Sequence, residues 1–153
     1  MRKLLLGGNN MFKRLFDIRE ENDLTQEDVG KILNVSRVAI SQWESGKEII
    51  PLEKLNTFAN HFNLSFDYLA NISDIKQYNN TSNDLDPILI GKRLKQLRTK
   101  NNLTLRDLAE ILNTSSSTIS AYETGKTLIL TSFAYELAVK FNISLDWICG
   151  KTK

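Results

Sequence analysis

The sequence contains only one cysteine, Cys149, and one histidine, His61, among its 153 residues. A single cysteine cannot form an internal disulfide, and the two residues supply no cluster for a zinc site. A single histidine also leaves no cluster of Ser, His and Asp of the kind that hydrolases use. We therefore expect no catalytic residues, no metal, no cofactor and no enzyme activity. His61 directly precedes Phe62 on a predicted helix, which favours a surface residue over a ligand.

Long apolar runs are also missing. No stretch approaches the roughly 18 consecutive apolar residues of a membrane-spanning helix. The opening "MRKLLLGG" is basic, but its leucines fall short of the roughly 7–15 apolar residues of a signal peptide. We therefore expect a cytoplasmic protein with no membrane partner.

The residues before Met11 bear on where translation starts. "GGNNM" back-translates to GGN-GGN-AAY-AAY-ATG, which can hold a purine-rich ribosome-binding site just upstream of a start codon. Both Met1 and Met11 are candidate starts. Our expectation is that translation begins at Met11 and that residues 1–10 are untranslated leader.

An internal repeat is the most informative feature of the sequence. A shift of 79 residues aligns residues 11–71 with residues 90–150 without a gap, and 23 of the 61 pairs are identical. This similarity indicates two domains of common ancestry. Residues 72–86 between the copies are polar and rich in Asn, Ser and Asp, so we interpret them as a flexible linker. Asp86 and Pro87 match an N-cap and a first-turn proline, and they open a second domain predicted for residues 87–150.

Each copy shows helical periodicity in short pieces, without the alternation of a strand. In the first copy, apolar positions from 12 to 16 mark a helix that ends near residue 22. "TQED", like "TLRD" in the second copy, matches the capping-box pattern at the start of a helix. Ser36 is the expected N-cap of a third helix, residues 55–62 form a fourth, and "SFDYLA" forms a short fifth. The predicted fold class is all-α, with two bundles of about five helices.

The third predicted helix, residues 36–44, has two different faces. Ile40 and Trp43 lie three residues apart and are expected in the core.

A short helix, a tight turn and a second helix with an exposed polar face make up the arrangement that inserts its second helix into the major groove of DNA. Arginine pairs with guanine, glutamine with adenine and serine with either, and valine can touch a thymine methyl group. An ordinary solvated helix face is the alternative. The outward side carries two i, i+4 rows, Arg37 with Ser41 and Val38 with Gln42.

A longer pattern joins these features. R-x-x-x-x-L-T-Q-x-x-(V/L)-(G/A)-x-x-L-x-(V/T)-S-x-x-x-I-S-x-(W/Y)-E-x-G-K runs through the first copy, and the second copy keeps all but the Gln. With it the sequence resembles the phage-repressor and Cro type of helix-turn-helix proteins, also called the xenobiotic response element (XRE) family. The resemblance covers about four fifths of the chain. It implies two tandem lambda-repressor-like domains that bind double-stranded DNA through recognition helices at about residues 36–44 and 115–123.

The resemblance also implies roles for individual residues. In that family, the Gln at the position of Gln26 caps against a DNA phosphate, and Lys47, just past the helix, would reach another. The remaining positions would meet phosphates or base edges. The full set of expected DNA-binding residues is Gln26, Ser36, Arg37, Val38, Ser41, Gln42 and Lys47 in the first copy, and Ser115, Ser116, Ser117, Ser120 and Lys126 in the second.

Other residues are implied as scaffold. The family pairs the Arg at Arg19 with the Glu at Glu44 in a structural ion pair, which Arg98 and Glu123 repeat. Trp43 and Tyr122 are expected in the core rather than as platforms for stacked bases. Gly46 and Gly125 are expected to end the recognition helices in a left-handed conformation.

The second copy differs from the first at the positions expected to contact DNA. Leu105 replaces Gln26, Ala121 replaces Gln42 and Leu130 replaces Pro51. The charge changes in the opposite sense. Residues 11–71 hold 7 basic and 10 acidic residues, net −3, whereas residues 90–153 hold 10 basic and 5 acidic, net +5. "GKRLKQLRTK" places five positive charges on the first helix of the second copy, where they would favour phosphate binding. An ordinary solvated helix face is the alternative.

These observations predict a bacterial or phage transcriptional regulator, a repressor that occupies a promoter or operator. A second copy of the chain is a further candidate partner. The alternative is a protein-interaction or antitoxin-like module in which one domain mediates dimerisation. It is supported by the negative charge of the first copy and the altered recognition helix of the second.

Overall fold

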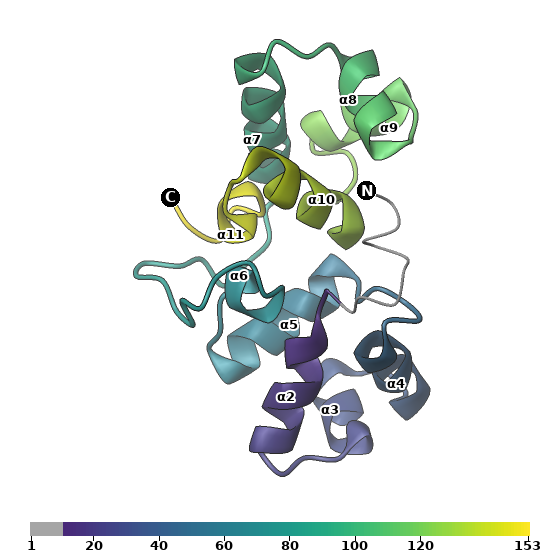
Figure 1. Cartoon of the computed structure of the whole chain (residues 1–153), viewed down its shortest axis with the longest axis vertical. Helices are drawn as coiled ribbons and strands as arrows, with labels where there is room; N and C mark the ends of the chain where they lie inside the picture. Colours follow the sequence, from purple (N-terminus) through teal and green to yellow (C-terminus); the bar gives the residue numbers. More distant parts are fainter. Residues whose placement is uncertain (1–10) are drawn as a thin grey trace. The chain divides into compact units, whose positions relative to one another are not determined.

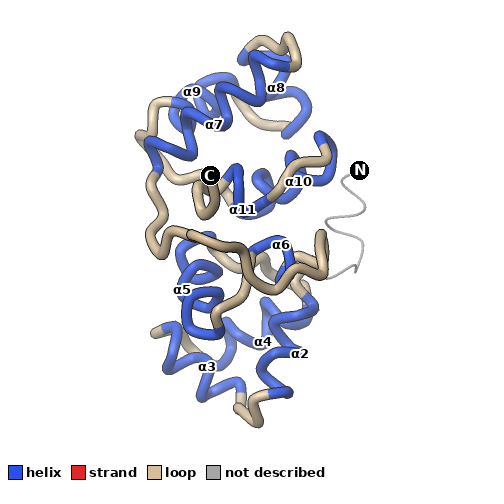
Figure 2. The backbone as a smooth tube through the Cα atoms, turned by 90° about the vertical axis from the view of Figure 1, so that its left-hand side faces the viewer, coloured by secondary structure: helices blue, strands red, loops and turns tan. Residues whose placement is uncertain are grey.

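The computed structural model describes residues 11–153, and these residues form helices and connecting turns without a strand. The predicted all-α fold class is confirmed. Between Tyr78 and Asn79 the chain divides into two compact units, each with five described helices (Figures 1 and 2). None of the described helices is both long and apolar enough to traverse a lipid bilayer. The expectation for Met1 and Met11 concerns residues 1–10 and lies outside the described residues.

The first unit follows the helix pattern read from the sequence. Thr25 forms a full capping box with Asp28, and the hydrogen bonds from the Thr25 amide and hydroxyl hold the pKa of that carboxyl below its usual value. Asn34 and Asn63 end their helices in the left-handed conformation. The helices are α2 (Lys13–Glu21), α3 (Gln26–Leu33), α4 (Arg37–Ser45), α5 (Leu52–Phe62) and α6 (Phe66–Leu69).

The second unit repeats this order, and its second helix has the same caps as α3. Thr104 and Asp107 form the matching capping box, and Asp86 caps a helix whose first residue is Pro87, as predicted. Gly125 has a positive φ of 75°, but it follows the C-cap Thr124 rather than being the cap itself. The helices are α7 (Pro87–Lys100), α8 (Leu105–Leu112), α9 (Ser116–Glu123), α10 (Thr131–Phe141) and α11 (Leu145–Ile148).

The two first helices differ in length, and the longer one packs closely on its neighbour. α2 starts after Phe12, whereas α7 starts more than a turn earlier relative to the repeat and runs past the end of α9 at Gly91. A Cβ atom on Gly91 would lie 2.4 Å from the carbonyl oxygen of Tyr122 and 2.6 Å from that of Glu123. Because those neighbours are backbone atoms, only glycine allows α7 this close to α9. The longer helix provides additional surface in the second unit.

Residues 72–86 are not a free linker, and the prediction of a flexible segment needs correction. Ser65, the N-cap of α6, donates its hydroxyl to the Ile75 carbonyl and its amide to the Lys76 carbonyl, both at 2.6 Å. Tyr78 donates to Asp67 at 2.7 Å. We call residues 73–78 the strap, since they hydrogen-bond along the first unit. Polar composition does not reveal this attachment, because the strap is held largely through its carbonyl groups.

In each unit, an arginine of the first helix binds backbone carbonyls in the fifth helix and in the chain after it. Arg14 donates to the carbonyls of Tyr68 and Ser73 and pairs with Asp74 at 2.9 Å. Its guanidinium lies 4.0 Å from the centre of the Tyr68 ring. Arg93 makes the matching hydrogen bonds in the second unit, to the carbonyls of Trp147 and Thr152. The chain after the fifth helix is therefore part of each unit.

We predict that the first unit needs its strap for stability. A fragment of residues 11–72 lacks the bonds to Ile75, Lys76, Tyr78 and Asp74 that a fragment of residues 11–78 retains. At about 1 kcal/mol for each hydrogen bond, the shorter fragment should lose several kcal/mol. For a domain of this size that corresponds to a melting temperature at least about 10 °C lower. Equal melting temperatures by circular dichroism would show that the strap contributes nothing.

Candidate nucleic-acid interface

The turn between α3 and α4 fixes the angle between the two helices. Asn34 adopts φ 57°, which reverses the chain, and the Val35 amide donates to the Gly30 carbonyl at 2.8 Å. A Cβ atom on Gly30 would lie 2.8 Å from the Val35 carbonyl oxygen, so the turn packs directly on α3. Ser36 then caps α4 by accepting from the Ala39 amide at 3.1 Å. The arrangement is a helix, a tight turn and a second helix.

The outward face of α4 is separated from the core by two anchors. Ile40 and Trp43 are buried, as predicted from their spacing. On the other side, Arg37 is exposed and Val38 is 53% exposed, an unusual state for a large apolar side chain. The two remaining positions of this face, Ser41 and Gln42, are partly exposed, while Ser36 and Lys47 are exposed at the two ends of the helix. All six residues are thus at least partly exposed, on α4 or directly beside its ends.

Arg19 and Glu44 form a bidentate ion pair beneath this face. Arg19 Nε lies 2.6 Å from Glu44 Oε2, and Nη2 lies 3.0 Å from Oε1. The third nitrogen, Nη1, donates to the Leu24 carbonyl at 2.8 Å. The two side chains are only 10% and 6% exposed, and the hydrogen bond to Glu44 raises the pKa of Arg19 above its ordinary value. The pair ties the end of α2 to the end of α4.

Gln26 is held by the same carboxylate. It is the first residue of α3, partly exposed, and its Nε2 donates to Glu44 Oε1 at 3.1 Å. The resemblance placed Gln26 against a phosphate and Glu44 in the scaffold. The structure adds a direct hydrogen bond between them, which the spacing in the sequence did not indicate.

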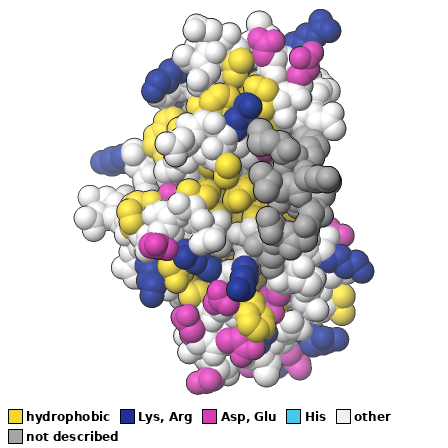
Figure 3. Space-filling view, viewed as in Figure 1, with side chains coloured by type: hydrophobic (Ala, Val, Ile, Leu, Met, Phe, Trp, Pro, Cys, Tyr) yellow, Lys and Arg dark blue, Asp and Glu magenta, His cyan; other side chains and the backbone are white. Residues whose placement is uncertain are grey.

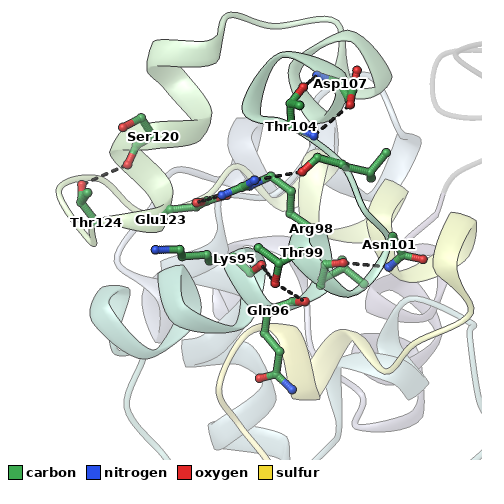
Figure 4. Close-up of polar contacts among 12 residues, drawn as sticks. Lys95, Gln96, Arg98, Thr99, Asn101, Thr104, Asp107, Ser120, Glu123 and Thr124 are labelled. Atoms are coloured by element: carbon green, nitrogen blue, oxygen red, sulfur yellow. Dashed lines mark hydrogen bonds and ion pairs between the residues drawn. The ribbon is translucent and has the colours of Figure 1, made fainter.

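The second unit keeps the scaffold and changes the outward face (Figure 4). Arg98 and Glu123 repeat the bidentate pair with distances of 2.6 and 3.0 Å, and Tyr122 is buried at the position of Trp43. Leu105 stands where Gln26 does, so no side-chain amide reaches Glu123 from that position. The Ser115 hydroxyl lies 3.0 Å from the Ser117 hydroxyl and 2.8 Å from that of Thr118.

The outward surface of the second recognition helix is therefore small and uncharged. Ser115, Ser116 and Ser117 are exposed, Ser120 is partly exposed, and only Lys126 beyond the helix carries charge.

The five positive charges of "GKRLKQLRTK" are not all available to a partner. Arg98 is in the ion pair, and Arg93 is bound to carbonyl groups, where burial lowers its pKa. The three exposed cations are Lys92, Lys95 and Lys100, which we call the α7 lysines. Lys95 projects on the side of α7 that faces the end of α9 (Figure 4). α7 carries all five charges counted from the sequence, but only three of them are on exposed side chains.

The first helices of the two units differ in charge at equivalent positions. Phe16, Glu20 and Glu21 of α2 occupy the positions of Lys95, Thr99 and Lys100 of α7. Phe16 is 40% exposed. On the face in Figure 3, acidic side chains gather over the first unit. α7 thus carries lysines at two positions where α2 carries an aromatic ring and a carboxylate.

Within residues 11–153, the structure shows no cluster of side chains that could hold a metal ion. In that range no three His, Cys, Asp or Glu side chains come together as a metal site requires. His61 is exposed on α5 and packs edge-on against Phe62, with ring centres 4.7 Å apart. Cys149 is buried and is not in a disulfide.

Comparison with known protein families gives two matches. A helix-turn-helix model matches residues 15–69, and a helix-turn-helix domain model matches residues 91–151. The two matched ranges contain both recognition helices and both ion pairs. The chain therefore carries two helix-turn-helix domains in tandem, the first of the XRE type.

Two characterised relatives resemble part of the chain. The HTH-type transcriptional activator BcrR of Enterococcus faecalis is 35% identical over 71 residues, which are 46% of this chain and 35% of that protein. The antitoxin PezA of Streptococcus pneumoniae serotype 4 is 35% identical over 65 residues, 42% of this chain and 41% of that protein. The chain thus spans less than half the length of each relative. No solved structure matched the chain.

We predict that Glu44→Ala acts through stability. Removal of the carboxylate leaves the buried Arg19 charge without its partner, at a cost of about 3–5 kcal/mol in unfolding free energy. Glu123→Ala should have a similar effect on the second unit, because its pair has the same geometry. Chemical denaturation measures both. If the Glu44→Ala protein is as stable as the parent but loses ligand binding, Glu44 acts in binding and not in stability.

Proposed function

We propose that the chain is a DNA-binding transcriptional regulator that acts by occupying a promoter or operator. The observation that supports this most directly is the outward face of α4, where Arg37, Val38 and Gln42 stand on a helix anchored by Ile40 and Trp43. A guanidinium, an amide and an exposed methyl group are the three chemistries that read guanine, adenine and thymine in the major groove. The two helix-turn-helix matches and a relative named as a transcriptional activator support the same class.

The first unit is the proposed reader of sequence. Val38 is exposed although water is an unfavourable environment for it, and contact with a thymine methyl would remove that surface from water. Ser36 and Lys47, at either end of α4, are placed to contact phosphates and so to orient the helix. A selection from a random DNA pool would give the preferred site and its symmetry.

On that site, Arg37→Ala and Gln42→Ala should each weaken binding by about 1–3 kcal/mol and relax the preference at one base position. Lys31→Ala is the matched control, because Lys31 is an exposed cation of the same unit that lies outside α4 and pairs with Glu27. Fluorescence anisotropy with the site and its single-base variants measures both effects. Unchanged preference in both variants would remove α4 as the reading helix.

The second unit is proposed to add affinity rather than sequence preference. Its recognition helix presents hydroxyl groups, which pair with any base, while the α7 lysines carry the positive charge. A tethered second contact is intramolecular and has an effective concentration in the millimolar range, so a weak site still raises overall affinity.

Neutralising the α7 lysines tests this division. Lys92→Gln, Lys95→Gln and Lys100→Gln together should lower the slope of log K against log salt by up to about 0.9 for each phosphate that is no longer neutralised, and the preferred bases should stay the same. Lys13→Gln is the control, since Lys13 is the exposed equivalent of Lys92 on α2. If the triple variant keeps the parent's affinity and slope, the α7 face is an ordinary solvated surface.

An antitoxin-like interaction module is the second candidate function. It is supported by the similarity to an antitoxin and by the net −3 charge of residues 11–71. Titration with genomic DNA fragments separates the two candidates. Binding that depends on Arg37 supports the regulator, whereas stable dimers without DNA binding support the module.

A further inference from the structure

The Glu44 carboxylate accepts hydrogen bonds from two different kinds of group. Arg19 donates to both oxygens, and the side-chain amide of Gln26 donates to Oε1. Glu44 is 6% exposed, whereas Gln26 lies above it at the partly exposed first turn of α3. A buried charged group thus contacts a residue of the proposed DNA surface.

The contact determines which end of the amide faces Glu44. A glutamine side chain has one carbonyl oxygen and an NH₂ group with two hydrogens, and an ionised carboxylate can only accept. Only the NH₂ group can therefore point at Glu44. One hydrogen engages Oε1, and the second stays available to an acceptor outside the protein. Phosphate oxygens also only accept, so a reversed amide would repel them.

The second unit shows that the ion pair does not require this amide. Arg98 and Glu123 have the same two distances, 2.6 and 3.0 Å, although Leu105 replaces Gln26. The hydrogen bond from Gln26 is therefore an addition to a scaffold that is complete without it. The addition occurs in the unit whose recognition helix presents Arg37 and Gln42.

We infer that Glu44 is a positioning residue for DNA binding, which orients the Gln26 amide so that an N–H group is presented to a backbone phosphate. The inference rests on the proposed function of the first unit. It gives Glu44 a role beyond the structural one that it shares with Glu123. Gln26 is neutral and displaces no counterion, so its contact should contribute affinity without changing the salt slope.

A double-mutant cycle in the full chain tests the inference, with the selected DNA site as the probe. Gln26→Leu copies the residue of the second unit and should lower DNA affinity about 5- to 20-fold, with the melting temperature and the salt slope unchanged. Glu44→Gln keeps the shape but replaces one acceptor oxygen with a donor, so the Gln26 amide loses its orientation and affinity should also decrease. In the Gln26→Leu background, Glu44→Gln should cause little further loss of affinity.

Glu123→Gln is the matched control, because it weakens the equivalent pair where no glutamine is present. It should lower the melting temperature about as much as Glu44→Gln does and leave DNA affinity nearly unchanged. Leu105→Gln provides a second measurement that does not depend on folding of the Glu44 variant. The new amide beside Glu123 should raise affinity several-fold, and the gain should disappear when Glu123 is also changed to Gln.

Each result decides between named alternatives. Losses that multiply in the double variant, together with no gain from Leu105→Gln, would overturn the positioning role and leave Glu44 as scaffold. A Gln26→Leu protein that binds as tightly as the parent would overturn it as well. Failure of the parent chain to bind any selected DNA would instead reject the proposed function itself, so the two failures are distinguishable.

Discussion

The buried pair of an arginine from the first helix and a glutamate from the end of the third is the interaction on which each unit depends. Arg19 binds Glu44 through two nitrogens and the Leu24 carbonyl through the third. One guanidinium thus links the end of α2, the turn before α3 and the end of α4. Because either charge alone would be buried without a partner, the three segments must assemble together. The pair therefore sets the position of the recognition helix relative to the rest of the unit.

This constraint explains which positions of the repeat are alike and which differ. Arginine, glutamate and the caps Thr25, Asn34 and Ser36 recur at the same places in the second unit, because they determine backbone geometry. Three outward positions of α4 differ, Arg37 from Ser116, Val38 from Ser117 and Gln42 from Ala121, whereas Ser41 and Lys47 recur as Ser120 and Lys126. Two units with one scaffold can therefore present different surfaces. The proposed function uses that separation, with one unit reading bases and the other holding phosphates.

Local sequence signals predicted most of the fold. Capping residues and apolar spacing are local, so the helices of both units could be located from the residues alone. The strap and the Arg14 and Arg93 contacts could not, because most of their acceptors are backbone carbonyls, which every residue carries. Those bound by the two arginines also lie more than 50 positions away. The partners of Arg93 were therefore missed when the five cations of α7 were counted as available. The outward residues of α4 were identified correctly as a face, whereas the Gln26–Glu44 contact joins positions 18 apart and had no sequence signal.

The strap also changes what the connection between the units can do. A free segment over residues 72–86 would reach about 20 Å as a flexible coil and about 50 Å when extended. Tyr78 is bonded to the first unit, and the Ser82 amide donates to the Lys151 carbonyl in the second. Only residues 79–81 lie between these anchors, with a reach of roughly 14 Å from Tyr78 to Ser82. A shorter tether raises the effective concentration of the second unit at a DNA site, provided that it can span the distance to be bridged. It also restricts where the second contact can be made. Release of the strap would therefore lengthen the tether between the units as well as destabilise the first unit.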